Sequence, residues 1–310
     1  MRKMVKLKPP INKKIMRFIK ILLLTIFAII GMIFSLRTNA QTEGIAVSPL
    51  IFELTAKPGE ILINTIKVYN PSDNIVSIKM EIEDFRPEGE TGQVIVEPGE
   101  DATYSLKKWV KIEPTEFTLK PKEQKFVSFT ISVPKNAEPG GRYASILAST
   151  TGMMQKEATG AVMAQKVGAL LLLTVSGEAK ESLILKEFSV SESSELASFK
   201  IRFENDGTVH LKPKGLIVIE NCQGKKIEDL EFPATNILPG VIRETDISWN
   251  VKSEDNCYNA YLVGTYGLDN KPFSSEKINF QTSSNTSSNS YAGGNILFLI
   301  LMIIFRIIRF

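Results

Sequence analysis

The chain has 310 residues, and its 37 basic and 34 acidic side chains give a formal net charge of +3. Eleven of the basic residues lie in the first 40 or the last 20 positions, so residues 41–290 hold 26 basic against 34 acidic side chains, a net charge of −8. Because nucleic-acid binding requires a basic surface, an acidic body of this kind argues against it, and we expect no nucleic-acid partner.

Residues 1–40 have the order of a secretory signal peptide. Eight basic residues and no acidic one lie before the apolar run Ile21–Leu36, and Thr38 and Ala40 follow at the positions of a small-residue cleavage pattern. This run has 16 residues, fewer than the ~20 that span a bilayer comfortably. We expect cleavage after Ala40. An uncleaved N-terminal anchor is the alternative, because Arg37 separates the apolar run from the cleavage site.

Residues 44–178 are expected to form a first β-sandwich. Apolar and polar residues alternate in "ILINTIKVYN", "IVSIKMEIEDF" and "KFVSFTISVP", and the turn sequence "PSDN" separates the first two segments. Such alternation, punctuated by turn residues at intervals of about ten positions, is typical of antiparallel sandwiches. Residues 86–101, "RPEGETGQVIVEPGED", are rich in Gly and Glu and are expected to form a hairpin or loop.

A second sandwich is expected at residues 181–281. The apolar run "GALLLLTVSG" ends at Gly177, and a new alternation begins in "EAKESLILKEFSV". The two units repeat one pattern of strand, Asn-initiated turn and strand, in "TIKVYNPSDNIVSIKMEI" and "SFKIRFENDGTVHLKPKGLIVI". The expected fold class is therefore all-β, with two tandem Ig-like β-sandwiches between the signal peptide and a C-terminal transmembrane helix.

The C-terminal end is expected to anchor the protein in a membrane. Residues 282–294 form a Ser/Asn/Gly tether, and residues 295–310 contain ten consecutive apolar residues followed by Arg306 and Arg309. By the positive-inside preference the arginines stay cytoplasmic, which gives a single-pass protein of the cell membrane with its ectodomain outside. An amphipathic or buried helix and a processed sorting tail are the alternatives.

The two cysteines are expected to pair. Cys222 and Cys257 are the only cysteines of the chain, and export would place them in an oxidising setting, where an even number of cysteines favours a disulfide. The alternative is two free thiols.

The sequence offers little for catalysis, and we expect no enzymatic activity, no cofactor and no metal. His210 is the only histidine, whereas a Ser/His/Asp site needs an orienting acid beside it and a transition-metal site needs several His or Cys ligands. Glu254, Asp255 and Asn256 are adjacent acidic and amide residues without the Gly-centred loop of a calcium site.

The segment around His210, "FENDGTVHLKPKGLIVIE", is expected to be structural. Asn205–Gly207 has the composition of a hairpin turn in which Gly supplies a positive φ. Pro213 cannot donate to a strand ladder, so the strand there is expected to be an edge strand, bulged or broken, with pairing resumed at Gly215. His210 would then pack and form hydrogen bonds that order the bend.

The same segment carries a resemblance to a known family. Together with "ILPGVIRETDISW" and "YNAYLVGTYG" it resembles the Ig-like domains of WxL-interacting bacterial cell-surface proteins. The matching positions are Asn205, Gly207, His210, Pro213, Gly215, Leu238, Pro239, Gly240 and Arg243. The first unit is similar to the peptidoglycan-binding module of those proteins, which itself resembles the N-terminal domain of pilus chaperones.

The resemblance implies a bacterial membrane-anchored cell-surface protein that is not an enzyme. Its expected partner is a cell-wall polymer such as peptidoglycan or another surface protein, recognised by loops or by strand addition. The alternatives are a periplasmic pilus-type assembly chaperone and a passive structural stalk.

Overall fold

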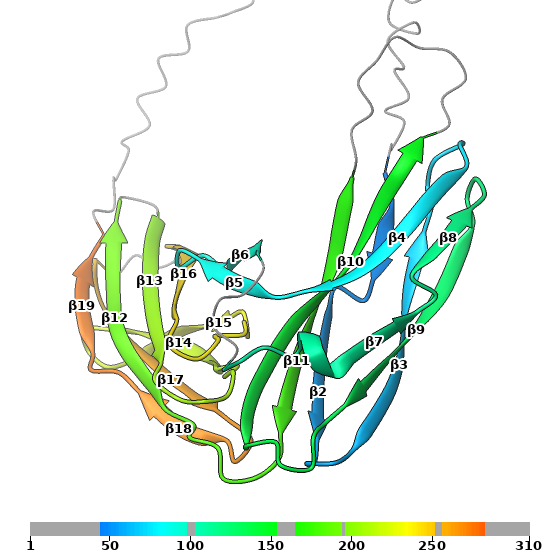
Figure 1. The fold of residues 1–310 in the computed structure, drawn as a ribbon. Coiled ribbons are helices and arrows are strands. Elements are labelled where there is room, and N and C mark those ends of the chain that lie inside the picture. Colours follow the sequence, from blue (N-terminus) through cyan, green and yellow to red (C-terminus); the bar gives the residue numbers. More distant parts are fainter. Residues whose placement is uncertain (1–43, 98–102, 154–164, 194–195, 252–255, 283–310) are drawn as a thin grey trace, which may run out of the picture.

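The computed structural model describes residues 44–97, 103–153, 165–193, 196–251 and 256–282. They form two β-sandwiches (Figure 1), which confirms the all-β prediction. Within these ranges, no helix has the length and apolar character needed to cross a membrane. The predicted signal peptide and C-terminal anchor, most of the tether, and Glu254 and Asp255 lie outside the described residues.

The first sandwich consists of two facing sheets. One has the strand order β1 (Ala46–Ser48), β3 (Ile61–Tyr69), β9 (Gln124–Ser132) and β7 (Val110–Glu113). The other has the order β2 (Ile51–Ala56), β11 (Lys166–Val175), β10 (Gly140–Met153), β4 (Val76–Glu83) and β8 (Glu116–Leu119). A hairpin of β5 (Phe85–Glu88) and β6 (Gln93–Val96) and a short 3₁₀ turn, Lys107–Trp109, complete the unit.

The apolar residues of the alternating segments form the core of this sandwich. Along β9, Val127, Phe129 and Ile131 point inward and are buried, whereas the residues between them face outward. Phe129 meets Phe52 of the opposite sheet edge to face, with ring centroids 5.0 Å apart. The core therefore lies between the two sheets, as the period of two requires.

The beginning of the chain changes sheet between β1 and β2. β1 pairs with the last three residues of β3, whereas β2 pairs in parallel with β11. The change occurs at the cis peptide bond between Ser48 and Pro49. As a result, the first half of β3 has no strand on its outer side among the described residues.

The second sandwich also has two sheets. One consists of β12 (Leu183–Glu192), β13 (Leu196–Asn205) and β16 (Ile242–Asn250). The other consists of β15 (Lys226–Phe232), β14 (Lys214–Asn221), β17 (Cys257–Tyr266) and β18 (Lys271–Ser274), and β19 (Ile278–Gln281) pairs with β17. Between the sheets, Trp249 packs on Tyr258 at a centroid distance of 5.1 Å.

A disulfide joins Cys222 and Cys257, with their Cα atoms 5.5 Å apart. Cys222 follows the last residue of β14, and Cys257 begins β17. These two strands are already neighbours in one sheet, so the disulfide ties together the ends of adjacent strands. Asn279 of β19 donates a hydrogen bond to the Cys222 sulfur at 3.3 Å.

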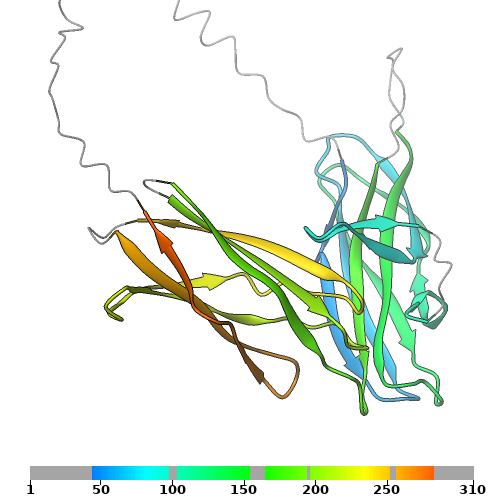
Figure 2. The same ribbon diagram turned by 90° about the vertical axis from the view of Figure 1, so that its left-hand side faces the viewer.

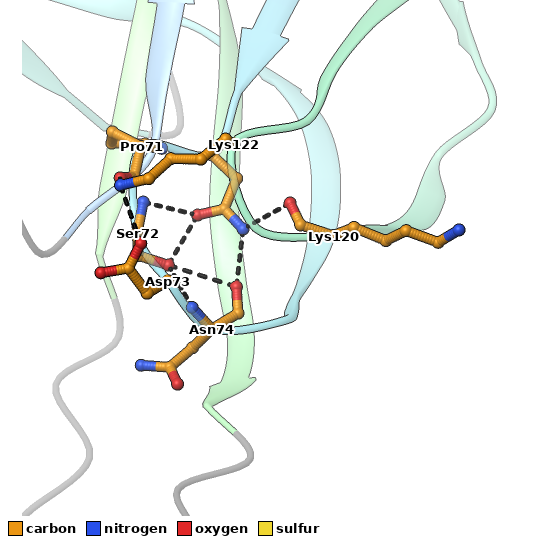
Figure 3. A network of polar contacts seen from close by, with 7 residues as sticks. Pro71, Ser72, Asp73, Asn74, Lys120 and Lys122 are labelled. Atoms are coloured by element: carbon orange, nitrogen blue, oxygen red, sulfur yellow. Dashed lines mark hydrogen bonds and ion pairs between the residues drawn. The ribbon is translucent and has the colours of Figure 1, made fainter.

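Each sandwich turns a corner at a fully buried asparagine. In the first, Asn70 Nδ2 donates to the carbonyls of Asn74 (2.7 Å) and Lys120 (2.9 Å), and its Oδ1 accepts from the Ser72 amide at 3.1 Å. Figure 3 shows the residues around this corner, where the ammonium of Lys122 also reaches the Pro71 carbonyl. The corner connects β3 of one sheet to β4 of the other.

The corresponding corner of the second sandwich corrects the expected hairpin. β13, which ends at Asn205, and β14, which begins at Lys214, belong to different sheets, so the turn between them connects sheets. Gly207 does not have a positive φ. A glycine is needed at position 207 because the backbone of Lys180 lies close to it. A Cβ there would overlap the Lys180 carbonyl oxygen. The strand is broken at Pro213, as expected, but β14 lies inside its sheet and is not an edge strand.

The two sandwiches lie side by side with their strands running in different directions (Figures 1 and 2). The β5–β6 hairpin leaves the first sandwich and reaches across to β16 of the second (Figure 1). All of this hairpin except Phe85 falls within residues 86–101, for which we expect a hairpin or loop. It encloses one side of the space between the two sandwiches.

Candidate functional site: the interdomain surface and a free strand edge

The segment that carries His210 contacts the first sandwich directly. The Gly141 amide of β10 donates to the Thr208 carbonyl oxygen at 2.8 Å. The His210 ring meets the Tyr143 ring edge to face, with centroids 5.8 Å apart. His210 is thus a packing residue, as expected, but what it packs against is the other sandwich.

The His210 ring is partly buried beside charged and polar residues, among them Glu53, Lys212 and Asn236. Its Nδ1 is buried and has no hydrogen-bond partner among the described residues, so the expected ordering hydrogen bond is not found at that atom. Burial lowers the pKa of His210, an effect that nearby Glu53 opposes and Lys212 reinforces. Burial also raises the pKa of Tyr143. The packing of His210 against Tyr143 and the absence of a partner at Nδ1 among the described residues favour a structural role.

A carboxylate of the first sandwich holds two residues of the second. Glu53 on β2 accepts hydrogen bonds from the Lys212 ammonium and the Asn236 amide, both at 2.7 Å. Burial alone would raise the pKa of Glu53, but these hydrogen bonds outweigh it and lower the pKa below its ordinary value. Lys212 is therefore engaged in an interdomain ion pair.

The tip of the β5–β6 hairpin makes a second charged contact. Both carboxylate oxygens of Glu90 accept from the Arg202 guanidinium on β13, at 2.6 and 2.7 Å. The Glu90 carbonyl oxygen accepts from the Glu244 amide of β16 at 2.8 Å. Hydrogen bonding to Arg202 lowers the pKa of Glu90. A two-point Arg–carboxylate pair has a fixed geometry, so it also orients the hairpin.

The structure distributes the predicted motif residues over several places. Asn205 and Gly207 lie at the buried corner, and Gly215 lies where β14 approaches β17 so closely that a Cβ would overlap the Val263 carbonyl oxygen. Pro239 and Gly240, with φ +73° at Gly240, form the turn before β16. His210, Leu238 and Arg243 lie at the surface between the sandwiches.

Sequence reasoning missed the partners of these residues in the first sandwich. Glu53, Glu90 and Tyr143 each contact residues more than 60 positions away, and no local pattern marks them. Glu90 lies between Gly89 and Gly92 in a segment that otherwise has the pattern of a strand. This spacing was the one signal in the sequence of an exposed hairpin tip.

A free strand edge is the second notable surface. Hydrogen bonds from Val133 N to Glu60 O and from Asn70 N to Glu123 O, both 2.9 Å, show that even-numbered residues of β3 bond to β9. The N–H and C=O groups of Ile61, Ile63 and Thr65 therefore point away from β9. Because β1 reaches only residues 67–69, no described strand pairs with them.

The side chains on this edge are uncharged, and two of the three are apolar. Ile61 is 63% exposed and Ile63 is 72% exposed. Proteins usually protect sheet edges with charged residues, and the outward residues of edge strand β7, Lys111 and Glu113, follow that rule. The β3 edge, defined here as Ile61, Ile63 and Thr65, does not.

Among the described residues, no group of three or more His, Cys, Asp or Glu side chains is arranged to hold a metal ion. The chemistry on the interdomain surface consists of ion pairs, aromatic packing and hydrogen bonds. The features that remain for binding are the β3 edge and the space between the sandwiches.

No family model and no curated protein matches the chain. Among solved structures, the class 5 fimbriae chaperone CfaA is 15% identical, covers 77% of this chain and 99% of its own, and has a TM-score of 0.38. The SafB chaperone of Salmonella enterica, solved with the SafA pilin, is 12% identical over 78% of this chain and 98% of its own, with a TM-score of 0.36. The E. coli chaperone DraB is 11% identical over 78% and 97%, also with a TM-score of 0.36.

CfaA is a fimbriae chaperone and SafB a chaperone solved with a pilin, which is the class expected only as an alternative. Identities and TM-scores this low give no inference about function. The specific resemblance to WxL-interacting proteins stays a prediction, and the function must be sought in the geometry of this chain.

Proposed function

We propose that this protein is a non-catalytic protein-binding module that takes up an extended segment of another exported protein by strand addition. The observation that carries the proposal is the β3 edge, which combines unpaired backbone groups with two exposed isoleucines. Export and anchoring in the cell membrane are part of the proposal and rest on residues 1–40 and 295–310.

Strand addition uses backbone hydrogen bonds and side-chain packing, and the β3 edge offers groups for both. The N–H and C=O groups of Ile61, Ile63 and Thr65 would bond to the backbone of the incoming segment, each bond contributing roughly 0.5–1.5 kcal/mol. Ile61 and Ile63 would pack against its outward side chains. Affinity would come from the backbone, and a preference for apolar residues at alternate positions would come from the two isoleucines.

Of the partners expected from the sequence, a surface protein fits this edge better than a cell-wall polymer. Strand addition needs a continuous row of peptide N–H and C=O groups, and the sugar strands of a wall polymer do not offer one. The same edge would serve a surface receptor, which retains its partner, or an assembly chaperone, which passes it on. A passive stalk would retain no segment at all.

The test is a selection of peptides followed by a proline scan. Decapeptides from a displayed random library would be selected on the full chain in detergent, and their affinities measured by fluorescence anisotropy. Ile63→Pro removes an N–H that points away from β9, so it would block the incoming strand and spare the β3–β9 ladder. We expect it to weaken binding at least tenfold.

Thr118→Pro is the matched control. Thr118 is an exposed residue of edge strand β8, and because Met80 N bonds to Thr115 O, its own backbone points away from β4. This variant should bind the peptides as the wild type does. Failure to select any peptide, or equal loss of affinity in both proline variants of equal melting temperature, would refute the proposal.

A further inference from the structure

A pocket of about 230 Å³ lies between the two sandwiches and the β5–β6 hairpin. Leu170 and Leu172 of β11 contribute to its wall on the side of the first sandwich, and Phe85 contributes from the hairpin. The second sandwich contributes Leu238 and Arg243. Most of this lining is apolar. Its charged residues are Glu53 and Lys212, which pair with each other, and Arg243, whose role the interdomain contacts do not explain.

Arg243 differs from the other basic residues of this surface. Arg202 is paired with Glu90, and Lys212 is paired with Glu53. No acidic side chain of the described residues pairs with Arg243, and desolvation is the cause that lowers its pKa. A partly buried cation without a counter-charge is costly, and an anion would offset that cost.

The guanidinium of Arg243 lies against the β5–β6 hairpin. It lies so close to Gly92 that a Cβ there would overlap Nη1. Gly92 has φ +88°, a backbone conformation that also favours glycine. The guanidinium thus lies against the hairpin of one sandwich, while its own strand, β16, belongs to the other.

We propose that this pocket binds a small monocarboxylate with an apolar body, its carboxylate on Arg243 and its body against Leu170, Leu172 and Phe85. A planar guanidinium binds a carboxylate with two parallel hydrogen bonds, which makes this anion the best match to a single arginine. The volume equals that of roughly eight water molecules and is smaller than the ~300–1,000 Å³ of pockets for drug-sized ligands. The ligand is therefore of the size of an arylalkanoate or a medium-chain fatty acid.

Such a ligand would link the two sandwiches. Its carboxylate would contact the second sandwich and its body the first, so a complex forms only when both are in place. Binding would then raise the temperature at which the interdomain contacts are lost, in proportion to the logarithm of ligand concentration. This effect is independent of the β3 edge, so the pocket and the proposed protein-binding function can fail separately.

The experiment compares an acid with its neutral isostere. The full chain in detergent would be titrated with 3-phenylpropionate and with 3-phenylpropionamide by isothermal titration calorimetry, with melting curves recorded in parallel. We expect saturable binding of one 3-phenylpropionate with a Kd below about 1 mM, and at least tenfold weaker binding of the amide. Arg243→Gln should lose at least tenfold in affinity for the acid and nothing for the amide.

Two further variants make the result decisive. Arg142→Gln is the matched control, because this guanidinium lies over the Trp109 ring outside the pocket, and its affinity should be unchanged. Ile51→Trp fills the pocket and leaves Arg243 in place, so it should lose binding of the acid even if Arg243→Gln does not fold. The proposal is overturned if the folded wild type shows no saturable binding, if acid and amide bind equally, or if Arg243→Gln or Ile51→Trp binds like the wild type.

Discussion

Asn70 and Asn205 make the same set of hydrogen bonds in the two sandwiches. Each is fully buried and donates Nδ2 to the carbonyl of the residue four positions later, Asn74 at 2.7 Å and Val209 at 2.8 Å. Each also accepts at Oδ1 from the amide two positions later. In both sandwiches a buried asparagine therefore holds the turn by which the chain passes from one sheet to the other.

Replacing either asparagine should destabilise its own sandwich. Asn70→Ala and Asn205→Ala each leave buried carbonyl and amide groups without a partner, which we expect to cost roughly 2–4 kcal/mol of unfolding free energy. Denaturant unfolding followed by tryptophan fluorescence would measure the loss, since Trp109 and Trp249 lie in different sandwiches. Asn74→Ala, which removes an exposed side chain, should change stability by less than about 0.5 kcal/mol. An equally small effect of Asn70→Ala would contradict this account.

Removal of the disulfide should weaken the second sandwich and leave the first unchanged. Cys222 and Cys257 are 35 positions apart, and the chain-entropy model assigns a loop of this length roughly 3–4 kcal/mol. The double variant Cys222→Ala, Cys257→Ala should therefore shift the Trp249 transition to lower denaturant concentration. Electrophoresis with and without reductant, and mass mapping of the two positions, would establish pairing in the exported protein. Free thiols in that form would contradict it.

The stability of the interdomain contact should depend on pH through His210. Its pKa in the folded state is lowered from 6.5, chiefly by burial, so below pH 6.5 the unfolded chain binds a proton that the folded chain does not. The unfolding free energy therefore shows no loss from His210 above pH 6.5. It falls as the pH drops toward the folded pKa, by at most about 1.4 kcal/mol per pH unit. Denaturant unfolding between pH 8 and pH 5 would measure this fall.

His210→Gln provides the comparison for that pH dependence. Glutamine does not titrate, so the variant should show a flatter profile over the same range. The pKa values of Glu53 and Glu90 are lowered from 4.5, so the stability they contribute is lost only at more acidic pH. Parallel profiles for wild type and variant would show that His210 is not the titrating group.

The ion pair between Glu90 and Arg202 should hold the hairpin to the second sandwich. In Glu90→Gln the charge attraction is lost, and we expect faster hydrogen exchange at the Glu244 amide, which bonds to the Glu90 carbonyl. Added salt should have the same effect on the wild type, because the pair is partly exposed. Glu88→Gln, an exposed residue on the same hairpin, should leave this exchange rate unchanged. An unchanged exchange rate at the Glu244 amide in Glu90→Gln would show that backbone contacts alone hold the hairpin to the second sandwich.

Several elements of the fold could be predicted because their signals are local. The alternation in 61–69 and 124–132 reflects the side-chain period of a strand with one buried face, and it produced β3 and β9. The Gly- and Glu-rich segment at 86–101 contains all of the β5–β6 hairpin except Phe85. The turn at Asn205 was located correctly but misread as a hairpin, because composition defines a turn and does not define which sheets it connects.

The candidate sites could be predicted only in part. Arg243 and His210 were singled out as motif residues, but nothing near them in sequence indicated a pocket or a ring contact with Tyr143. The free β3 edge could not be predicted from the sequence for a similar reason. "ILINT" has the same alternation as a paired strand, and the edge is free only because the preceding segment leaves for the other sheet after Ser48.

The sequence by itself determined the strand-forming segments, the apolar sides that become the two cores and the positions where the chain turns. Those features depend on neighbours within a few residues, for which the backbone period and turn chemistry suffice. Only the tertiary structure decided that Arg243 lies against Gly92, that Glu53 and Glu90 hold the second sandwich, and that Ile61 and Ile63 line an open edge. These relationships join residues distant in sequence, and they exist only once both sandwiches have packed against each other and each strand has its neighbours.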